Sequence, residues 1–236
     1  METNQNLYNQ RLNRLITTTN HQEPDRVPII NFAETYCISY ANSSVEDCLK
    51  DPQKEFEVYA QLHKDVYMDA TFGMCINRAM NVFQVLENNA YFISEDGTTI
   101  QHQEVAPMLE TEYPAFAKDP ISFGRNVIFP RKYAPLNQAY PKNLEALKSA
   151  ALAFADYAKK MGDASEYAKE TLGLPTLAGT PIFAPVDFIM DYLRGFRGIQ
   201  LDMRRRPEEL AEAAEALVPI MIQVASMGKP RLDPFP

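Results

Sequence analysis

The stretch TPIFAPVDFIMDYLRGFRGIQLDMRRRP, residues 180–207, decides more about the fold than any other part of the chain. An apolar run with two prolines leads into DFIMDYLRG, and a second amphipathic piece, GIQLDM, leads through RRRP into a long apolar segment. Proline favours the first position of a helix, and glycine favours its end. The pattern therefore predicts helices over residues 188–194 and 207–227, with Gly195 and Gly198 ending the first.

Upstream of this stretch, short apolar runs alternate with helical patterns. VPIINF at residues 27–32 and VYMDATFG at residues 66–73 are typical of buried strands, and a helix is expected between them. A long helix over residues 144–162, continued over residues 165–172, precedes a third strand at residues 175–180. Strand, helix and strand in this order form the crossover unit of a parallel sheet. We therefore predict an α/β fold.

Two further segments depart from that alternation. Residues 81–105 contain Asp96-Gly97 between two alternating runs, which predicts a small antiparallel hairpin insertion. Residues 106–141 contain six prolines, so we expect short helical turns along the surface rather than long elements.

Composition limits the class of protein. The chain has 236 residues, 46% of them hydrophobic, with a net charge of −8, which suits one globular domain with an acidic surface. An acidic surface repels phosphate backbones and anionic lipids, so we expect neither nucleic acid nor membrane as a partner. The polar amino terminus and the lack of a CxxC pair among three cysteines predict a cytoplasmic protein.

Several segments, taken in order, resemble the uroporphyrinogen decarboxylase (URO-D) superfamily. They are EPDRVPI at residues 23–29, VEDCLKDPQKEFEVYAQLHKDVYMDATF at 45–72, DGTTIQH at 96–102 and APVDFIMDYLRGFRGIQLDMRRRPEEL at 184–210. The superfamily includes methyltransferases that move methyl groups between corrinoid proteins, coenzyme M and methylated substrates. The resemblance covers residues 11–228 and implies a (β/α)₈ TIM barrel whose active site lies at the carboxyl ends of the strands.

Only three parallel strands can be placed before the chain ends, whereas a closed barrel has eight. We therefore expect one URO-D-like domain over residues 1–236, forming the amino-terminal half of a partial barrel and truncated before the carboxyl half. A half barrel leaves a strand edge and an apolar face uncovered. The partner that we expect is therefore a second copy in a homo-oligomer, or the missing barrel half.

The resemblance leaves three functions open. The first is methyl transfer between a small methylated substrate or thiol and a corrinoid protein. It is favoured because residues 28–49 lack the arginines with which the decarboxylases bind substrate carboxylates. Uroporphyrinogen decarboxylation is the second, and it would need a basic cluster elsewhere, at Arg194, Arg197 and residues 204–206. A non-catalytic binding or assembly subunit is the third.

Zinc and a corrinoid are implied as cofactors by the resemblance alone. The methyltransferases hold zinc largely by His and Cys ligands in the carboxyl half of the barrel, beyond residue 236. The histidines of this chain, His21, His63 and His102, show no tight ligand spacing, so no metal site is assigned.

Five residues are candidates for the site. Glu34 and Asp69 are the predicted catalytic carboxylates, and Asn31, Asp187 and Tyr192 are the predicted substrate-binding residues. Asn31 and Glu34 fall at the carboxyl end of the first strand, which faces the pocket of a barrel. Asp69 lies in an apolar strand, where a carboxylate must be paired or functional. Helix capping by Glu34 or Asp187 and a structural hydrogen bond at Asp69 are the alternatives.

Overall fold

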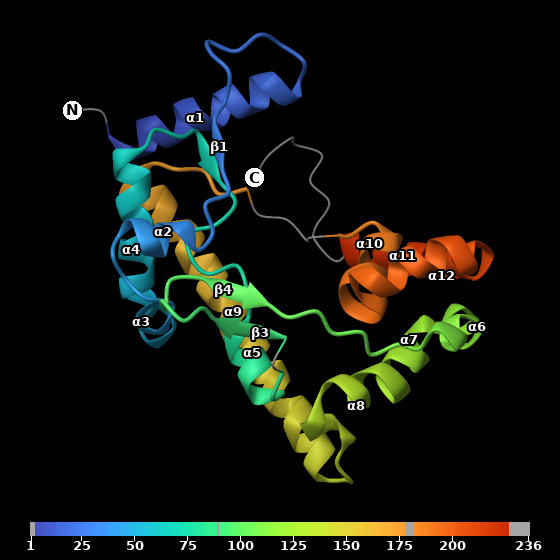
Figure 1. Ribbon diagram of the computed structural model, residues 1–236. Helices are drawn as coiled ribbons and strands as arrows, with labels where there is room; N and C mark the ends of the chain where they lie inside the picture. The colour runs from blue at the N-terminus through green and yellow to red at the C-terminus, as the bar shows by residue number, and fades with distance from the viewer. Residues whose placement is uncertain (1–2, 89, 178–181, 227–236) are drawn as a thin grey trace.

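The computed structural model describes residues 3–88, 90–177 and 182–226, and within these ranges the chain is mostly helical. Figure 1 shows two groups of elements arranged as an open C. One group, here called the sheet lobe, comprises residues 4–102 and 142–177. The other, the helical lobe, comprises residues 108–137 and 182–226.

The described residues of the sheet lobe contain two short parallel strands and one further parallel bridge. β1 (Ile30–Asn31) pairs with β2 (Ala70–Thr71), and Thr71 forms a parallel bridge to Thr176. Helix α4 (Pro52–Asp65) connects the first two strands, and the 31-residue α9 (Lys142–Leu172) precedes the third. These two helices pack against each other. The order of β1, α4 and β2 along the chain is the strand–helix–strand order expected from the sequence.

The parallel strands are much shorter than predicted. β1 and β2 have two residues each, whereas the sequence predicted strands over residues 27–32 and 66–73. Of the third predicted strand, residues 175–180, the last three lie outside the described residues. Parallel sheets are normally covered on both faces. Here Ile30, Phe32 and Phe72 are 45%, 61% and 47% exposed, so one face of the sheet is uncovered by the described residues. The α/β assignment is thus only weakly supported, and a partial TIM barrel is not shown.

The other elements of the sheet lobe surround α4 and α9. An antiparallel hairpin, β3 (Tyr91–Ile93) with β4 (Ile100–His102), turns at Gly97, whose φ of 72° favours glycine. It lies within the range predicted for a hairpin. The remaining helices are α1 (Asn4–Thr19), α2 (Tyr36–Tyr40), α3 (Val45–Lys50) and α5 (Met80–Val85).

Helix α9 continues through Gly162, where the sequence predicted an end. Nothing lies within 4 Å of a Cβ built on Gly162, and Ala164 and Ala168 beyond it are buried. One glycine costs a helix about 1 kcal/mol, which packing further along can offset. The helix ends instead at Gly173, whose φ of 56° is the left-handed conformation typical of a helix C-cap.

The series of short helical turns predicted over residues 106–141 is present over residues 110–137. Its elements are the 3₁₀-helix η1 (Glu110–Glu112), α6 (Tyr113–Lys118), α7 (Pro120–Phe123), the π-helix η2 (Gly124–Ile128), α8 (Phe129–Lys132) and the 3₁₀-helix η3 (Ala134–Asn137).

The carboxyl-terminal helices pack on these turns. They are α10 (Pro185–Ile189), the π-helix η4 (Met190–Arg194), α11 (Gly195–Arg205) and α12 (Pro207–Ala225). The helix predicted from residue 188 begins at Pro185, and Met227, predicted to end the last helix, lies outside the described residues. No helix among the described residues is long and apolar enough to cross a membrane.

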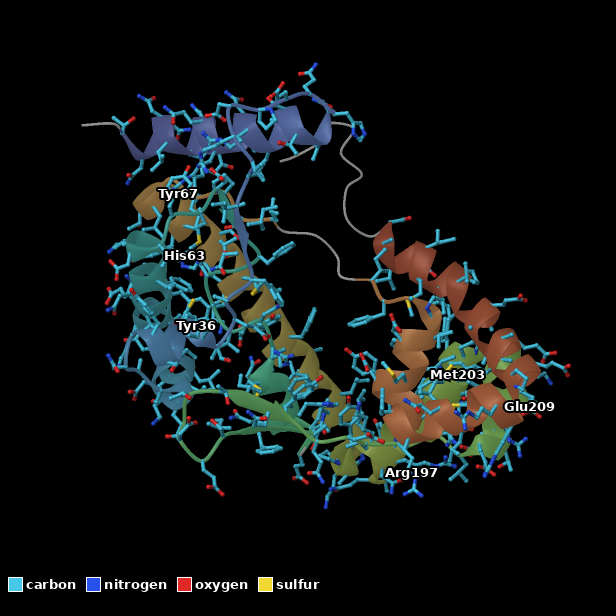
Figure 2. All side chains as sticks on the ribbon, turned by 45° about the horizontal axis from the view of Figure 1, so that its top comes forward. Tyr36, His63, Tyr67, Arg197, Met203 and Glu209 are labelled. Carbon is cyan, nitrogen blue, oxygen red and sulfur yellow. The ribbon has the colours of Figure 1, made fainter. Side chains whose placement is uncertain are left out.

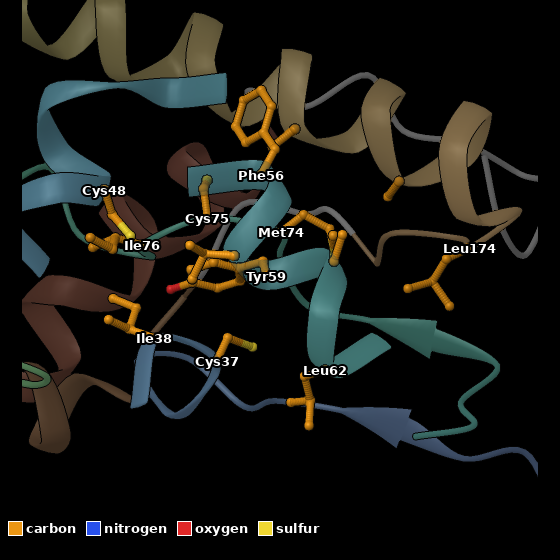
Figure 3. Close-up of a cluster of buried hydrophobic side chains, with 14 of the residues drawn as sticks. Cys37, Ile38, Cys48, Phe56, Tyr59, Leu62, Met74, Cys75, Ile76 and Leu174 are labelled. Atoms are coloured by element: carbon orange, nitrogen blue, oxygen red, sulfur yellow. The ribbon is translucent and has the colours of Figure 1, made fainter. Parts of the chain in front are cut away.

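Each lobe has its own core. In the sheet lobe, Tyr59 and Phe56 of α4 pack among aliphatic side chains and three buried cysteines, Cys37, Cys48 and Cys75 (Figure 3). The core of the helical lobe gathers Tyr113, Phe116 and Leu193 with seven further buried residues: Met108, Ile128, Ile189, Ile199, Leu210, Ala213 and Leu217.

Candidate functional site

The segments that follow β1 and β2 lie side by side, because parallel strands end at the same edge of a sheet. Together they line a small pocket, which is formed by Phe32, Ala33, Glu34, Thr71, Phe72, Gly73, Cys75 and Asn77. The edge-to-face contact of Phe32 with Phe72, with ring centroids 5.5 Å apart, forms an apolar part of this edge. The pocket is therefore at the position where a parallel α/β fold presents its ligand site.

Glu34 supplies the carboxylate of this pocket. It forms an ion pair with Nη1 of Arg78, and both side chains remain partly exposed, by 26% and 33%. The φ of Glu34 is 44°, a left-handed conformation that is uncommon for a residue other than glycine. Such backbone strain is concentrated at functional sites. The conformation and the ion pair together place a charged, solvent-accessible pair at the carboxyl end of the sheet.

Arg78 connects this pair to a group of tyrosines between the lobes. Its guanidinium carbon lies 5.4 Å from the ring centroid of Tyr91 in β3. Tyr192 of η4 interacts electrostatically with both Tyr91 and Arg78, and Tyr133 interacts with Tyr91 and Tyr192. Burial is the largest cause of the raised pKa of both Tyr133 and Tyr192. These residues come from three segments that are distant in the sequence. We call the group of Tyr91, Tyr133 and Tyr192 the tyrosine junction.

Of the five predicted site residues, Glu34 pairs with Arg78, and Tyr192 interacts electrostatically with the same guanidinium. Arg78 itself was missed, because no motif marks it. The signal that could have found it is its position seven residues after β2, on the carboxyl-end loop. Tyr192 belongs to a π-helix, an irregularity that is frequent at functional sites.

Asp69 lies at the other end of the strands. It precedes β2, is fully buried and accepts hydrogen bonds from Arg14, Arg26, the Tyr67 hydroxyl and the Ile29 backbone N–H. Burial raises the pKa of Asp69, but these hydrogen bonds and the charge of Arg14 outweigh it, and the pKa is lowered overall. The carboxylate therefore holds α1 and the segment before β1 to the sheet. It does not share a pocket with Glu34.

Asn31 and Asp187 are also separate from the pocket. The side-chain amide of Asn31 lies 3.2 Å from Nε2 of His63, a buried residue of α4. His63 and Tyr67 both lie in the sheet lobe below α1 in Figure 2. Asp187 is exposed in the first turn of α10, where a carboxylate favours the helix dipole. Neither residue is placed beside Glu34.

Two of the five arginines in the basic cluster needed for the decarboxylase alternative are engaged elsewhere. Arg194 pairs with Asp202 at 2.6 Å and donates to the Met108 carbonyl, and Arg206 pairs with Glu209 at 3.0 Å. Arg197 lies on the helical lobe (Figure 2). Arg194 and Arg206 therefore stabilise the helical lobe rather than converge on the pocket.

The residues that the structure describes do not fit a zinc site. Among them there is no group of three His, Cys, Asp or Glu side chains that could hold a metal ion. Burial raises the pKa of Cys37 to about 12, of Cys48 to about 11 and of Cys75 to about 12. Zinc takes thiolate ligands, which these thiols do not readily supply.

Comparison of the chain with family models, with curated proteins and with solved structures finds no match in any of the three.

Proposed function

We propose that β1, β2 and the segment bridged at Thr176 are part of a URO-D-like (β/α)₈ barrel that serves methyl transfer between a small methylated substrate or thiol and a corrinoid protein. The observation that carries the proposal is the Glu34–Arg78 pair at the common carboxyl edge of β1 and β2. Barrel enzymes bind their substrates at that edge. The resemblance described above supplies the reaction class.

We assign distinct roles to three side chains, of which Glu34 lines the pocket and Arg78 and Tyr192 lie outside its lining. Glu34 accepts a hydrogen bond or a proton from the substrate, because it is the partly exposed carboxylate of the pocket. Arg78 orients Glu34 through their ion pair. Tyr192 encloses the substrate from the helical lobe. No step is assigned to zinc, since the described residues do not fit it.

The uncovered face of the sheet supports an expectation about partners. Ile30, Phe32 and Phe72 would line the interior of a closed barrel, and their exposure favours coverage by further strands or by a second copy. Light scattering of the purified chain, alone and with a candidate partner, measures the mass of the assembly. A chain that stays monomeric and binds none of the candidate partners would contradict this expectation.

Turnover is tested with methylcobalamin and 2-mercaptoethanesulfonate, by following the absorbance of the corrinoid. We expect thiol-dependent demethylation with the unmodified chain and a loss of about a hundredfold in Glu34→Gln, as for removal of an acid–base group. Glu46→Gln is the matched control, because Glu46 is exposed on α3 and its one ion pair among the described residues is with Lys50.

A parallel assay distinguishes the alternatives. Carbon dioxide release from uroporphyrinogen would establish the decarboxylase instead. A folded chain that assembles cleanly but catalyses neither reaction would support the non-catalytic subunit and would contradict methyl transfer. Equal activity of the Glu34→Gln and unmodified chains would contradict the catalytic role that we assign to Glu34.

A further inference from the structure

Lys132 is a half-buried cation at the tyrosine junction. It is the last residue of α8, and its Nζ lies 5.4 Å from the ring centroid of Tyr192 and 5.8 Å from that of Tyr133. Among the described residues, no carboxylate lies within ion-pair distance of it. Burial alone lowers the pKa of Lys132, without an opposing contribution from a nearby carboxylate.

Two other cationic side chains, Arg131 and Lys160, each form an ion pair, which Lys132 lacks among the described residues. Arg131, next in sequence, has a bidentate pair with Glu112 at 2.7 Å for both contacts, and Lys160 pairs with the buried Glu55 at 2.8 Å. A buried ammonium without a counter-ion is unfavourable, because desolvation is not offset by an opposite charge. Placing one among aromatic rings offsets only part of that cost. An unpaired ammonium in such a position is therefore suited to a ligand that brings the missing negative charge.

A second cation, Arg78, lies over a different ring of the junction, that of Tyr91. Arg78 and Tyr91 both interact electrostatically with Tyr192, over which Lys132 lies. Glu34 neutralises Arg78, so the three charged groups Glu34, Arg78 and Lys132 carry a net charge of +1. Asp191 also interacts with Tyr192, but it is exposed to solvent and screened.

We propose that the tyrosine junction binds a small organic anion, with Lys132 contacting its carboxylate or sulfonate group and Tyr133 and Tyr192 packing against its apolar part. Arg78 lies on the side of the ligand that faces Glu34. The proposal deepens the proposed function, on which it rests for the location of the substrate, by specifying the charge and shape of that substrate. Lys132 and Tyr192 come from separate elements of the helical lobe, and Tyr91 and Arg78 come from the sheet lobe, so the ligand would bridge the lobes.

Equilibrium binding tests the proposal without any turnover. Benzoate and the neutral, similarly shaped benzamide are titrated into the full chain, and the Lys132 side-chain and tyrosine ring signals are followed by nuclear magnetic resonance. We expect saturable binding of benzoate with shifts at Lys132 and Tyr192, and markedly weaker binding of benzamide. Lys132→Met should weaken benzoate binding about tenfold or more, as for loss of one charge-assisted contact, while Lys132→Arg should retain most of it.

Lys148→Met is the matched control, because Lys148 is exposed on α9, and it should bind benzoate as the unmodified chain does. Circular dichroism verifies that each variant is folded. Equal binding of benzamide, unchanged binding in Lys132→Met, or no saturable binding of benzoate would each overturn the proposal. Because no reaction is measured, failure of methyl transfer with intact benzoate binding would overturn only the proposed function.

Discussion

Arg14 and Asp69 form a buried ion pair at the amino end of the parallel strands, with Nη1 of Arg14 2.5 Å from Oδ1 of Asp69. Arg14 also holds Asp25 through two contacts of 2.6 Å, and Arg26 reaches the same oxygen of Asp69 at 2.8 Å. The pair thus attaches α1 and the segment before β1 to the start of β2. The pair gives a structural reason for a carboxylate within the apolar run at residues 66–73, at the end of the sheet remote from the pocket.

Asp69→Asn should destabilise the fold by about 3 kcal/mol, because it removes the charge of a fully buried carboxylate that accepts from two arginines and leaves the buried Arg14 with only the exposed Asp25 as a counter-ion. Urea unfolding measures the loss. Asp163→Asn is the control, since its pair with Lys159 lies on the surface of α9, and it should change the free energy of unfolding by about 0.5 kcal/mol or less. Equal effects of the two substitutions would contradict the anchoring role of Asp69.

The same carboxylate should make stability depend on acid pH. The pKa of Asp69 in the folded chain is lowered, so the folded state binds fewer protons than the unfolded state does. Its contribution is therefore complete above the ordinary aspartate pKa of about 4 and is lost as the pH falls through the lower pKa of the folded state. The difference in unfolding free energy between the unmodified chain and Asp69→Asn should shrink from pH 7 to pH 3. A difference that grows in acid would show the opposite shift.

Two glycines should respond in opposite directions to alanine. Gly195, with φ 70° and ψ 166°, lies in a region that is essentially restricted to glycine, and a Cβ there would approach Glu104 Oε1 within 2.3 Å. Gly195→Ala should cost about 1–3 kcal/mol. Gly162→Ala should instead gain about 0.5–1 kcal/mol, because Gly162 lies inside α9 with space around it. Thermal unfolding of both variants tests the signs, and a stabilising Gly195→Ala would contradict this backbone geometry.

The glycines also show what the sequence could and could not predict. Local signals located the hairpin at Asp96-Gly97 and the order of the strands. They misjudged Gly162, because the packing beyond it is set by tertiary contacts that no local pattern contains. In the site, strand periodicity put Asp69 in a strand but did not show at which end of the sheet it lies. The contacts of Arg78 and Lys132 with the tyrosines join segments that are distant in the sequence, and the sequence alone does not specify which distant segments meet.

Removing the hydroxyl group from either of two buried tyrosines, Tyr59 and Tyr113, should change the free energy of unfolding in opposite directions. The Tyr59 hydroxyl is buried without a hydrogen-bond partner among the described residues, whereas that of Tyr113 donates to Asp202 at 2.8 Å. An unpaired buried hydroxyl is costly, so Tyr59→Phe should stabilise the chain by about 1 kcal/mol. Tyr113→Phe should destabilise it by about 1.5–3 kcal/mol, because a bond to a charged group is lost. Urea unfolding provides both values, and two changes of the same sign would contradict the contrast.

The three cysteines should be unreactive in the folded chain. Cys37, Cys48 and Cys75 are each buried, and burial raises the pKa of their thiols to about 11 or 12. The thiolate is the reactive form, so neither access nor ionisation favours attack on a reagent at neutral pH. A disulfide reagent such as 5,5′-dithiobis(2-nitrobenzoate) should therefore label no thiol rapidly in buffer and all three in denaturant. Because Cys75 lines the edge of the pocket, rapid labelling of that thiol alone would show that the pocket opens further than the contact of Cys75 with Met161 of α9 allows.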